Sequence, residues 1–227
     1  MKHVLILSIL LISNNLNSYS IPNEPINTVE FTLPTIEVRA TCTQCEVKML
    51  IDSINNIDLT KLTELTDEQI IFDYLPAVNN KLRNYQKRNY ISIVKMAPVW
   101  DYLLIKYKIP KFISISFWIE ETGWGKSTLF INHYNLGGIK CHGCSDAYRA
   151  KDDCGDDFCK FRKFDSLIEG IDFWAKVLTK DRYLKHITKS EGYKHHIRAY
   201  KKGGYWTSPN GTKNRINHCD KLQLNKL

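Results

Sequence analysis

Apolar side chains recur at helical spacing through much of the second half of the chain. From about Asn89 onward they return with the period of a helix that buries one face. Proline is tolerated in the first turn of a helix but not in its interior, so Pro98 and Pro110 mark starts or breaks. We therefore predict a helix that starts or kinks at Pro98, a second over 111–122, and a short third over 127–133.

The helical period is lost between residues 141 and 164. Residues 148–151 and 158–162 alternate in polarity, and the acidic segment 152–157 lies between them. This pattern is typical of a β-hairpin with an acidic tip.

Helical patterning returns after residue 164. Ser166 and Glu169 have the spacing of a capping box, and an amphipathic stretch continues from there to Leu178. Two further helices are expected, one over residues 190–202 and one from about Thr212. Helices around one small hairpin predict an α+β fold.

The N-terminal third of the chain has a different character. An apolar run, Val4–Ile12, precedes the small-x-small triplet Ser18-Tyr19-Ser20, which predicts a secretory signal peptide over residues 1–20. The alternatives are an uncleaved anchor and a buried strand, although the run is too short to span a bilayer as a helix. Residues 21–88 carry helical fragments, including a capping box at 66–69, but no evident chemistry. We assign them to an extension of unknown role and residues 89–227 to the functional domain.

The chain of 227 residues carries a net charge of +8, from 32 lysines and arginines against 24 acidic residues. A basic surface favours polyanions, a class that includes nucleic acids, anionic membranes and bacterial cell walls. The basic residues are scattered and no nucleic-acid motif is present, so we expect no nucleic-acid partner. We also expect no cofactor.

The seven cysteines favour disulfides if the chain is exported. Four of them lie between Cys141 and Cys159, where they can staple the hairpin region, and the odd count leaves at least one unpaired or intermolecular. The alternative is a structural zinc site, because Cys42-x-x-Cys45 and Cys141-x-x-Cys144 have ligand spacing. The two pairs are too far apart for a compact zinc finger, so we expect no metal.

The end of the predicted helix 111–122 carries the most informative residues. The apolar run ends in Glu120 and Glu121, and a turn of small residues around Trp124 follows. A carboxyl group at the end of an apolar helix can have its pKa raised by burial, which suits a proton donor. A tryptophan face is a surface on which sugars rest. Two further segments follow downstream, Asn135–Lys140 and Tyr205–Asn210.

Together these three segments resemble the N-acetylglucosaminidases of glycoside hydrolase family 73, the flagellar-type and autolysin-type wall hydrolases. The resemblance covers roughly residues 89–222. It implies a lysozyme-like fold, mostly helical, with one small β-hairpin lobe that flanks an active-site groove. It also implies hydrolysis of the β-1,4 bond between N-acetylglucosamine and N-acetylmuramic acid in peptidoglycan.

The resemblance implies roles for individual residues. Glu121 matches the glutamate that acts as general acid, for which an ion pair with Lys126 is the structural alternative. Glu120 is expected either to face solvent or to support the catalytic glutamate as a neighbouring partner. The second carboxylate is expected on the hairpin lobe, where Asp153 is our first choice and Asp152 the next. The acidic tip of the hairpin can equally be a solvated turn or a loose calcium site.

Other matched residues are expected to form the walls of the site. Tyr205 matches a tyrosine that lines the cleft near the catalytic glutamate. Trp206 replaces a residue that is usually small in the family. The residues expected to bind substrate are Trp124, Asn135, Gly138 and Trp206.

The sequence leaves several alternative functions open. A lytic transglycosylase on a similar fold needs one acid and no water, and a non-catalytic wall-binding module would keep the groove alone. A zinc-linked structural protein is a third alternative. We expect a monomeric protein, secreted or periplasmic, that acts on peptidoglycan glycan strands without stable membrane insertion after signal removal. A phage lysin acting on a host wall would look the same.

Overall fold

The computed structural model divides the chain into two units, Met1–Arg39 and Ala40–Leu227. The residues it describes all belong to the second unit and comprise 43–64, 74–75, 84–150, 159–187 and 192–227. The predicted signal peptide, the capping box at 66–69 and the acidic segment with Asp152 and Asp153 lie outside these residues. Within the described ranges, no helix is both long enough and apolar enough to cross a membrane.

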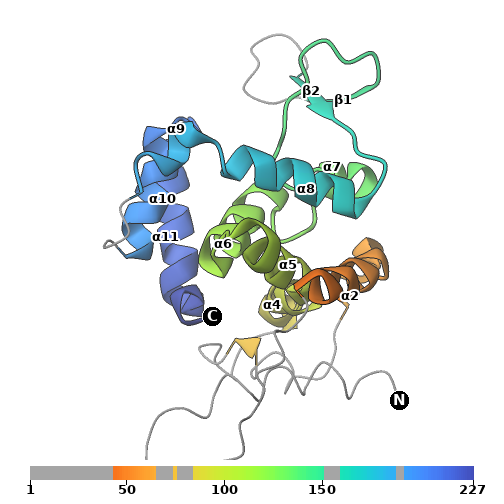
Figure 1. Cartoon of the computed structure of the whole chain (residues 1–227), viewed down its shortest axis with the longest axis horizontal. Helices are drawn as coiled ribbons and strands as arrows, with labels where there is room; N and C mark the ends of the chain where they lie inside the picture. Colours follow the sequence, from red (N-terminus) through yellow and green to blue (C-terminus); the bar gives the residue numbers. More distant parts are fainter. Residues whose placement is uncertain (1–42, 65–73, 76–83, 151–158, 188–191) are drawn as a thin grey trace, which may run out of the picture. The chain divides into compact units, whose positions relative to one another are not determined.

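Helix α6 (Lys111–Thr122) is the central element of the second unit (Figure 1). Every residue from Ile113 to Ile119 is buried. A helix that is apolar on all sides is stable only where other elements cover it all round. Helices α5 (Ala97–Tyr107), α10 (Tyr193–Lys202) and α11 (Gly211–Leu222) supply that cover.

The predicted helix boundaries around α6 are confirmed. Helix α4 (Asn84–Lys95) gives way to α5 beside Pro98, which lies in the first turn of α5. Pro110 is the N-cap of α6. Helix α7 (Thr128–His133) begins at Ser127, whose hydroxyl accepts a hydrogen bond from the Phe130 N–H at 3.2 Å.

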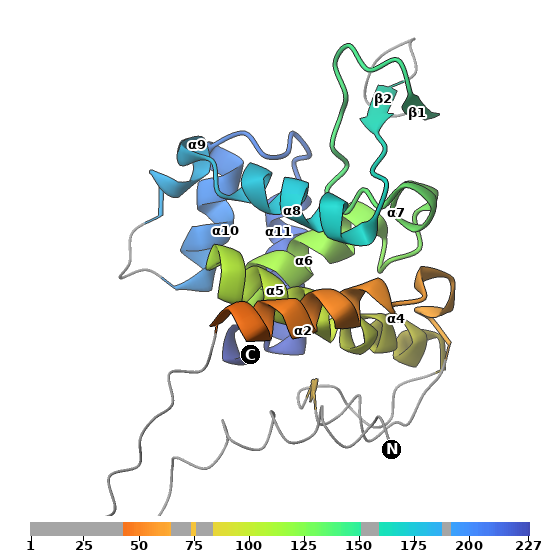
Figure 2. The ribbon, with the colours of Figure 1, turned by 45° about the vertical axis from the view of Figure 1, so that its right-hand side comes forward.

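Part of the predicted N-terminal extension packs into the same core. Helix α2 (Thr43–Asn55) lies along α5 and α8, and a 3₁₀ turn, η1 (Leu59–Lys61), follows it (Figure 2). Ile54 and Leu62 are buried against this core. The boundaries at residues 20 and 88 stay predictions, but residues 43–62 are built into the second unit.

The predicted hairpin is present at one end of the helical body, beyond α7 and α8 (Figures 1 and 2). Strands β1 (Ala147–Ala150) and β2 (Cys159–Arg162) pair antiparallel, with Tyr148 opposite Phe161. Helices around one small sheet confirm the α+β class.

Disulfides occur at the base of this hairpin. Cys141 and Cys144 are bonded to each other, and Cys159 is also disulfide-bonded. The bond between Cys141 and Cys144 removes two thiolates that the zinc alternative requires. Over the described part of the chain, no cluster of histidine, cysteine and acidic side chains is suited to hold a metal.

Helix α8 (Leu167–Leu178) begins at the predicted capping residues. The Ser166 hydroxyl accepts from the Glu169 N–H, and the Glu169 carboxylate accepts from the Asp165 N–H at 2.8 Å. In its first turn Gly170 approaches the backbone of Tyr134 so closely that a Cβ there would lie 2.0 Å from the carbonyl oxygen. Helix α8 therefore lies directly on the segment that follows α7.

The C-terminal elements complete the cover of α6. A short helix, α9 (Asp181–Leu184), precedes α10, and a 3₁₀ turn, η2 (Leu224–Lys226), follows α11 and packs on α6. The sequence pattern predicted α10 and α11 but not α9, since a four-residue helix is too short to show a period.

Candidate active site

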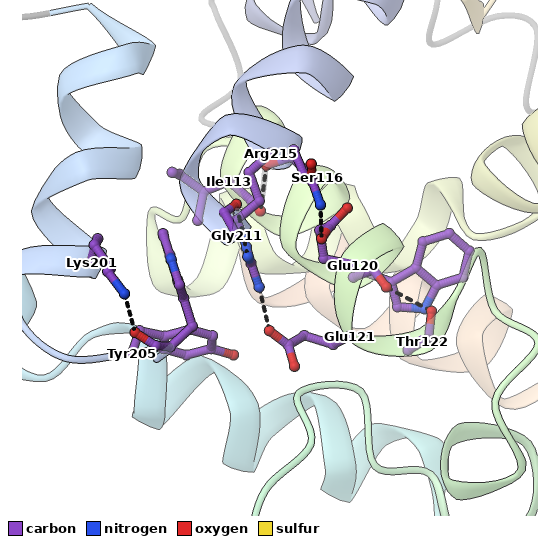
Figure 3. A network of polar contacts seen from close by, with 12 residues as sticks. Ile113, Ser116, Glu120, Glu121, Thr122, Lys201, Tyr205, Gly211 and Arg215 are labelled. Atoms are coloured by element: carbon purple, nitrogen blue, oxygen red, sulfur yellow. Dashed lines mark hydrogen bonds and ion pairs between the residues drawn. The ribbon is translucent and has the colours of Figure 1, made fainter. Parts of the chain in front are cut away.

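Glu121 lies in the last turn of α6, and its side chain is 21% exposed. Its Oε1 atom accepts a hydrogen bond from the guanidinium of Arg215 in α11 (Figure 3). A Cβ placed on Gly138 would lie 3.2 Å from Oε2, so the other oxygen faces the segment that leads to the hairpin. The carboxylate is thus held between α11 and the base of the hairpin lobe.

The turn after Glu121 is fixed by its small residues. Gly123 ends α6 in the left-handed region at φ 56°, and the Thr122 hydroxyl accepts from the Gly125 N–H at 2.8 Å. A Cβ on Gly125 would lie 2.7 Å from the ring of Trp118. Gly125 therefore lies against the protein's own core.

Arg215 is a site residue that the sequence pattern did not reveal. Its side chain is 3% exposed, and its guanidinium carbon lies 4.1 Å from the ring centroid of Trp206 and 4.9 Å from that of Phe117. Its Nη1 atom donates to the Gly211 carbonyl at 3.0 Å. Arginine is rarely buried unless it is paired, and nothing in a run of polar residues distinguishes a buried arginine from an exposed one.

Tyr205 and Glu121 approach the same short segment from two directions. A Cβ on Gly137 would lie 3.1 Å from the Tyr205 hydroxyl, while the next residue, Gly138, faces Glu121. Consecutive Cα atoms are about 3.8 Å apart, so the phenol and the carboxylate lie near each other. Figure 3 shows them turned towards the same space between α6 and α8. Tyr205 therefore lies near Glu121, as the sequence predicted.

The environment of Tyr205 keeps its phenol protonated. Its hydroxyl oxygen accepts a hydrogen bond from Trp174 Nε1 at 2.8 Å. Burial, and then the negative charge of Glu121, raise the pKa of Tyr205 well above its ordinary value. The residue can donate a hydrogen bond near neutral pH but cannot serve as a base.

Asn135 connects the helical body to the hairpin lobe. Its amide nitrogen donates to the Ile139 carbonyl at 3.0 Å and to the Arg162 carbonyl at 2.9 Å, and its oxygen accepts from the Ile139 N–H at 2.9 Å. The side chain is almost completely buried. The predicted anchoring of the loop by local backbone bonds is confirmed. Contact with substrate stays a prediction for Asn135, whose amide donors are both engaged within the protein.

Replacing Asn135 with alanine should destabilise the protein by about 3 kcal/mol, because two carbonyls and one N–H lose their partner. The free energy of unfolding, measured by chemical denaturation, tests this expectation. Asn214→Ala is the matched control, since the Asn214 amide is engaged at 3.2 Å with Glu120 in a half-buried site. We expect its loss to be below about 1 kcal/mol. Equal losses in the two variants would contradict the bridging role of Asn135.

Glu120 turns towards α11 rather than towards solvent. Its two oxygens contact Asn214 Nδ2 at 3.2 Å and His218 Nε2 at 2.7 Å. Burial raises the pKa of Glu120, but the hydrogen bonds from His218 and Asn214 outweigh this effect and hold it below the ordinary value. Glu120 therefore links α6 to α11, and a supporting role beside Glu121 stays a prediction.

The predicted aromatic residues occupy different surroundings. Trp124 is half-buried and makes edge contacts at 5.5 Å with Tyr90 and with His218, on the Glu120 side of α6. Trp206 is 9% exposed and packs against Arg215. For both residues, contact with a sugar stays a prediction. Lys126, the alternative partner of Glu121, instead donates to Asn89, and the ion pair of Glu121 is made with Arg215.

Comparison with known proteins places the chain in a family. The sequence profile described as mannosyl-glycoprotein endo-beta-N-acetylglucosaminidase matches residues 97–224, more than half of the chain. No curated protein matches the sequence.

The chain is also similar to solved structures from two bacteria. The catalytic domain of the autolysin Auto from Listeria monocytogenes is 20% identical with a TM-score of 0.51, over 71% of this chain and 98% of that one. A peptidoglycan hydrolase from Sphingomonas sp. A1 is 23% identical with a TM-score of 0.46, over 58% of this chain and 87% of that one. The likeness to Auto supports the expected lysozyme-like fold, and the profile confirms the resemblance found in the sequence. The chain belongs to the endo-β-N-acetylglucosaminidase family, glycoside hydrolase family 73.

Proposed function

We propose that the protein is a peptidoglycan hydrolase that cleaves the β-1,4 bond between N-acetylglucosamine and N-acetylmuramic acid. The observation that carries this proposal is the position of Glu121, at the end of a buried helix and beside Tyr205 and Gly138 in a domain of this family. Peptidoglycan is the substrate named for the Sphingomonas relative. The net charge of +8 also suits an anionic wall.

Glu121 acts in this proposal as the general acid. Cleavage of a glycosidic bond needs a proton on the leaving oxygen and stabilisation of an oxocarbenium-like centre. Glu121 delivers the proton, and the protonated Tyr205 donates a hydrogen bond to the sugar or to an intermediate. Trp124, Gly138 and Trp206 are proposed to contact the glycan.

Asp153, followed by Asp152, remains our candidate for the second carboxylate. The described residues of the hairpin lobe, 140–150 and 159–164, contain one other carboxylate, Asp146, which is largely exposed and ion-paired with Lys163. An exposed ion pair of this kind is a poor candidate for chemistry in a desolvated site.

The proposed setting is extracytoplasmic, because the substrate lies outside the cell membrane. Secretion would follow from the predicted signal peptide over residues 1–20. A cell's own wall-remodelling enzyme and a phage lysin are both compatible with this setting, and we propose that either form acts as a monomer on glycan strands.

Digestion of purified peptidoglycan, followed by mass analysis of the fragments, tests the function. We expect fragments that end in a reducing N-acetylglucosamine. Anhydro-sugar ends would instead indicate a lytic transglycosylase, and binding without cleavage would indicate a wall-binding module. A glycoprotein with high-mannose glycans should be included, since the family description names that substrate. Release of its glycans with peptidoglycan left intact would overturn the proposal.

A further inference from the structure

We propose that Arg215 is the positioning residue for Glu121: it fixes Oε1, so that the proton delivered to substrate is carried on Oε2, on the side of Gly138. This inference rests on the proposed role of Glu121 as general acid. It concerns a residue of α11, and it assigns that residue a task in the reaction.

Arg215 is held in one place by three neighbours. Its guanidinium carbon lies 4.1 Å from the ring centroid of Trp206 and 4.9 Å from that of Phe117, and these two rings contact each other edge to face at 5.3 Å. Nη1 donates to the Gly211 carbonyl at 3.0 Å. The contacts with two adjacent aromatic rings, together with the hydrogen bond from Nη1, restrict the rotation of the guanidinium.

Gly211 is part of the same arrangement. A Cβ at this position would lie 2.7 Å from Cδ1 of Trp206 and 2.9 Å from Nη1 of Arg215. A side chain at position 211 would therefore push the indole and the guanidinium apart. We call Trp206, Gly211 and Arg215 the arginine seat.

The chemistry of the guanidinium decides which oxygen of Glu121 holds the proton. Arginine has five N–H donors and no acceptor. The oxygen that it contacts, Oε1, must accept a hydrogen bond, and a proton placed there would face another N–H. The neutral acid is therefore stable with its proton on Oε2, which faces Gly138. A glycine at this position leaves room beside Oε2 for the substrate.

The guanidinium also influences the pH at which Glu121 can act. Arg215 of α11 and the neutral Tyr205 lie beside Glu121, while the neighbouring Glu120 is turned to Asn214 and His218. A positive charge beside a carboxyl group favours its ionised form. Without Arg215, Glu121 should keep its proton to higher pH. Because a general acid must be protonated to act, the basic limb of the activity profile should move upward.

Arg215→Met and Arg215→Lys should be assayed for kcat and KM on soluble glycan strands across pH. In Arg215→Met we expect kcat to fall about 10–100-fold with KM changed by less than about twofold. We also expect the basic limb of the pH profile to move to higher pH. Arg215→Lys keeps the positive charge but loses the planar guanidinium. The basic limb of its pH profile should therefore stay close to that of the wild type, while kcat falls.

Lys106→Met is the matched control, because it removes a positive charge that is paired with Asp172 at 3.2 Å, in a different ion pair from that of Glu121. Its pH profile should match the wild type. If Arg215→Met lowers stability and kcat but leaves the limb in place, Arg215 is merely structural and the proposal is wrong.

A second variant covers the case in which Arg215→Met does not fold. Gly211→Ala keeps every charge but displaces the guanidinium, and it should move the limb in the same direction by a smaller amount. Titration of the ¹³C carboxyl signal of Glu121 in each folded protein gives a readout independent of turnover. If the wild type cleaves no glycan yet this signal titrates higher in Gly211→Ala, the proposed function fails while the electrostatic effect of Arg215 stands.

Discussion

Glu121→Gln should reduce kcat about 10²–10⁴-fold, since an amide keeps the shape of the carboxyl group but cannot deliver its proton. The glutamine oxygen can still accept from Arg215, so the fold should be retained. The rate of appearance of reducing ends from purified glycan strands measures this effect. The circular dichroism spectrum of the variant checks that the helices are intact.

Glu120→Gln provides the matched control. Glu120 is the adjacent residue on α6, its side chain is also 21% exposed, and it too is bonded to α11. Removing its charge weakens the contact with His218 but does not touch the proposed proton path. We expect turnover within about threefold of the wild type. If the two variants lose activity equally, or if Glu121→Gln remains fully active, Glu121 is not the acid.

Gly170→Ala should destabilise the protein by about 3 kcal/mol or more, through overpacking against backbone. The added Cβ would lie 2.0 Å from the Tyr134 carbonyl oxygen, a group that cannot rotate away as a side chain can. Alanine is the better helix former by about 1 kcal/mol, so without this contact the sign would be the opposite. Chemical denaturation of the purified variant gives the free energy of unfolding.

The same substitution should also affect the site. Tyr134 precedes Asn135, and the loop that follows brings Gly138 to Glu121. If α8 moves away from Tyr134, this loop loses its support, and turnover should fall even where the variant is folded. Gly192→Ala is the control, because a Cβ there meets nothing within 4 Å at the start of α10. Equal stability of the two variants would contradict the close approach of α8.

The elements around the site were predictable where local signals agreed. Residues 111–122 were predicted as a helix from an apolar run bounded by Pro110 and by the small-residue turn, and α6 has these bounds. The hairpin was predicted from the alternation of polar and apolar residues, and the structure contains it. The start of α8 was predicted from the capping residues Ser166 and Glu169. In each case short-range steric or hydrogen-bonding rules coincide with tertiary packing.

Other features depend on contacts between distant segments, which a sequence pattern does not encode. Arg215 contacts Glu121, which lies 94 residues earlier in the sequence. Asn214 contacts Glu120 at the same sequence separation. The position of Trp206 under a guanidinium, and the close approach of Gly170 to Tyr134, likewise arise only when helices pack. The roles of Asp152 and Asp153, which lie outside the described residues, stay predictions.

The arginine seat has an evolutionary consequence. Because a side chain at position 211 would occupy the space of the Trp206 edge and of Nη1, the present position of the Arg215 guanidinium depends on glycine at 211. The three positions should therefore be inherited together or exchanged together. Relatives that carry a larger residue at the position of Gly211 must orient their acid by other means, so their optimum acidity for wall cleavage should differ from that of this protein.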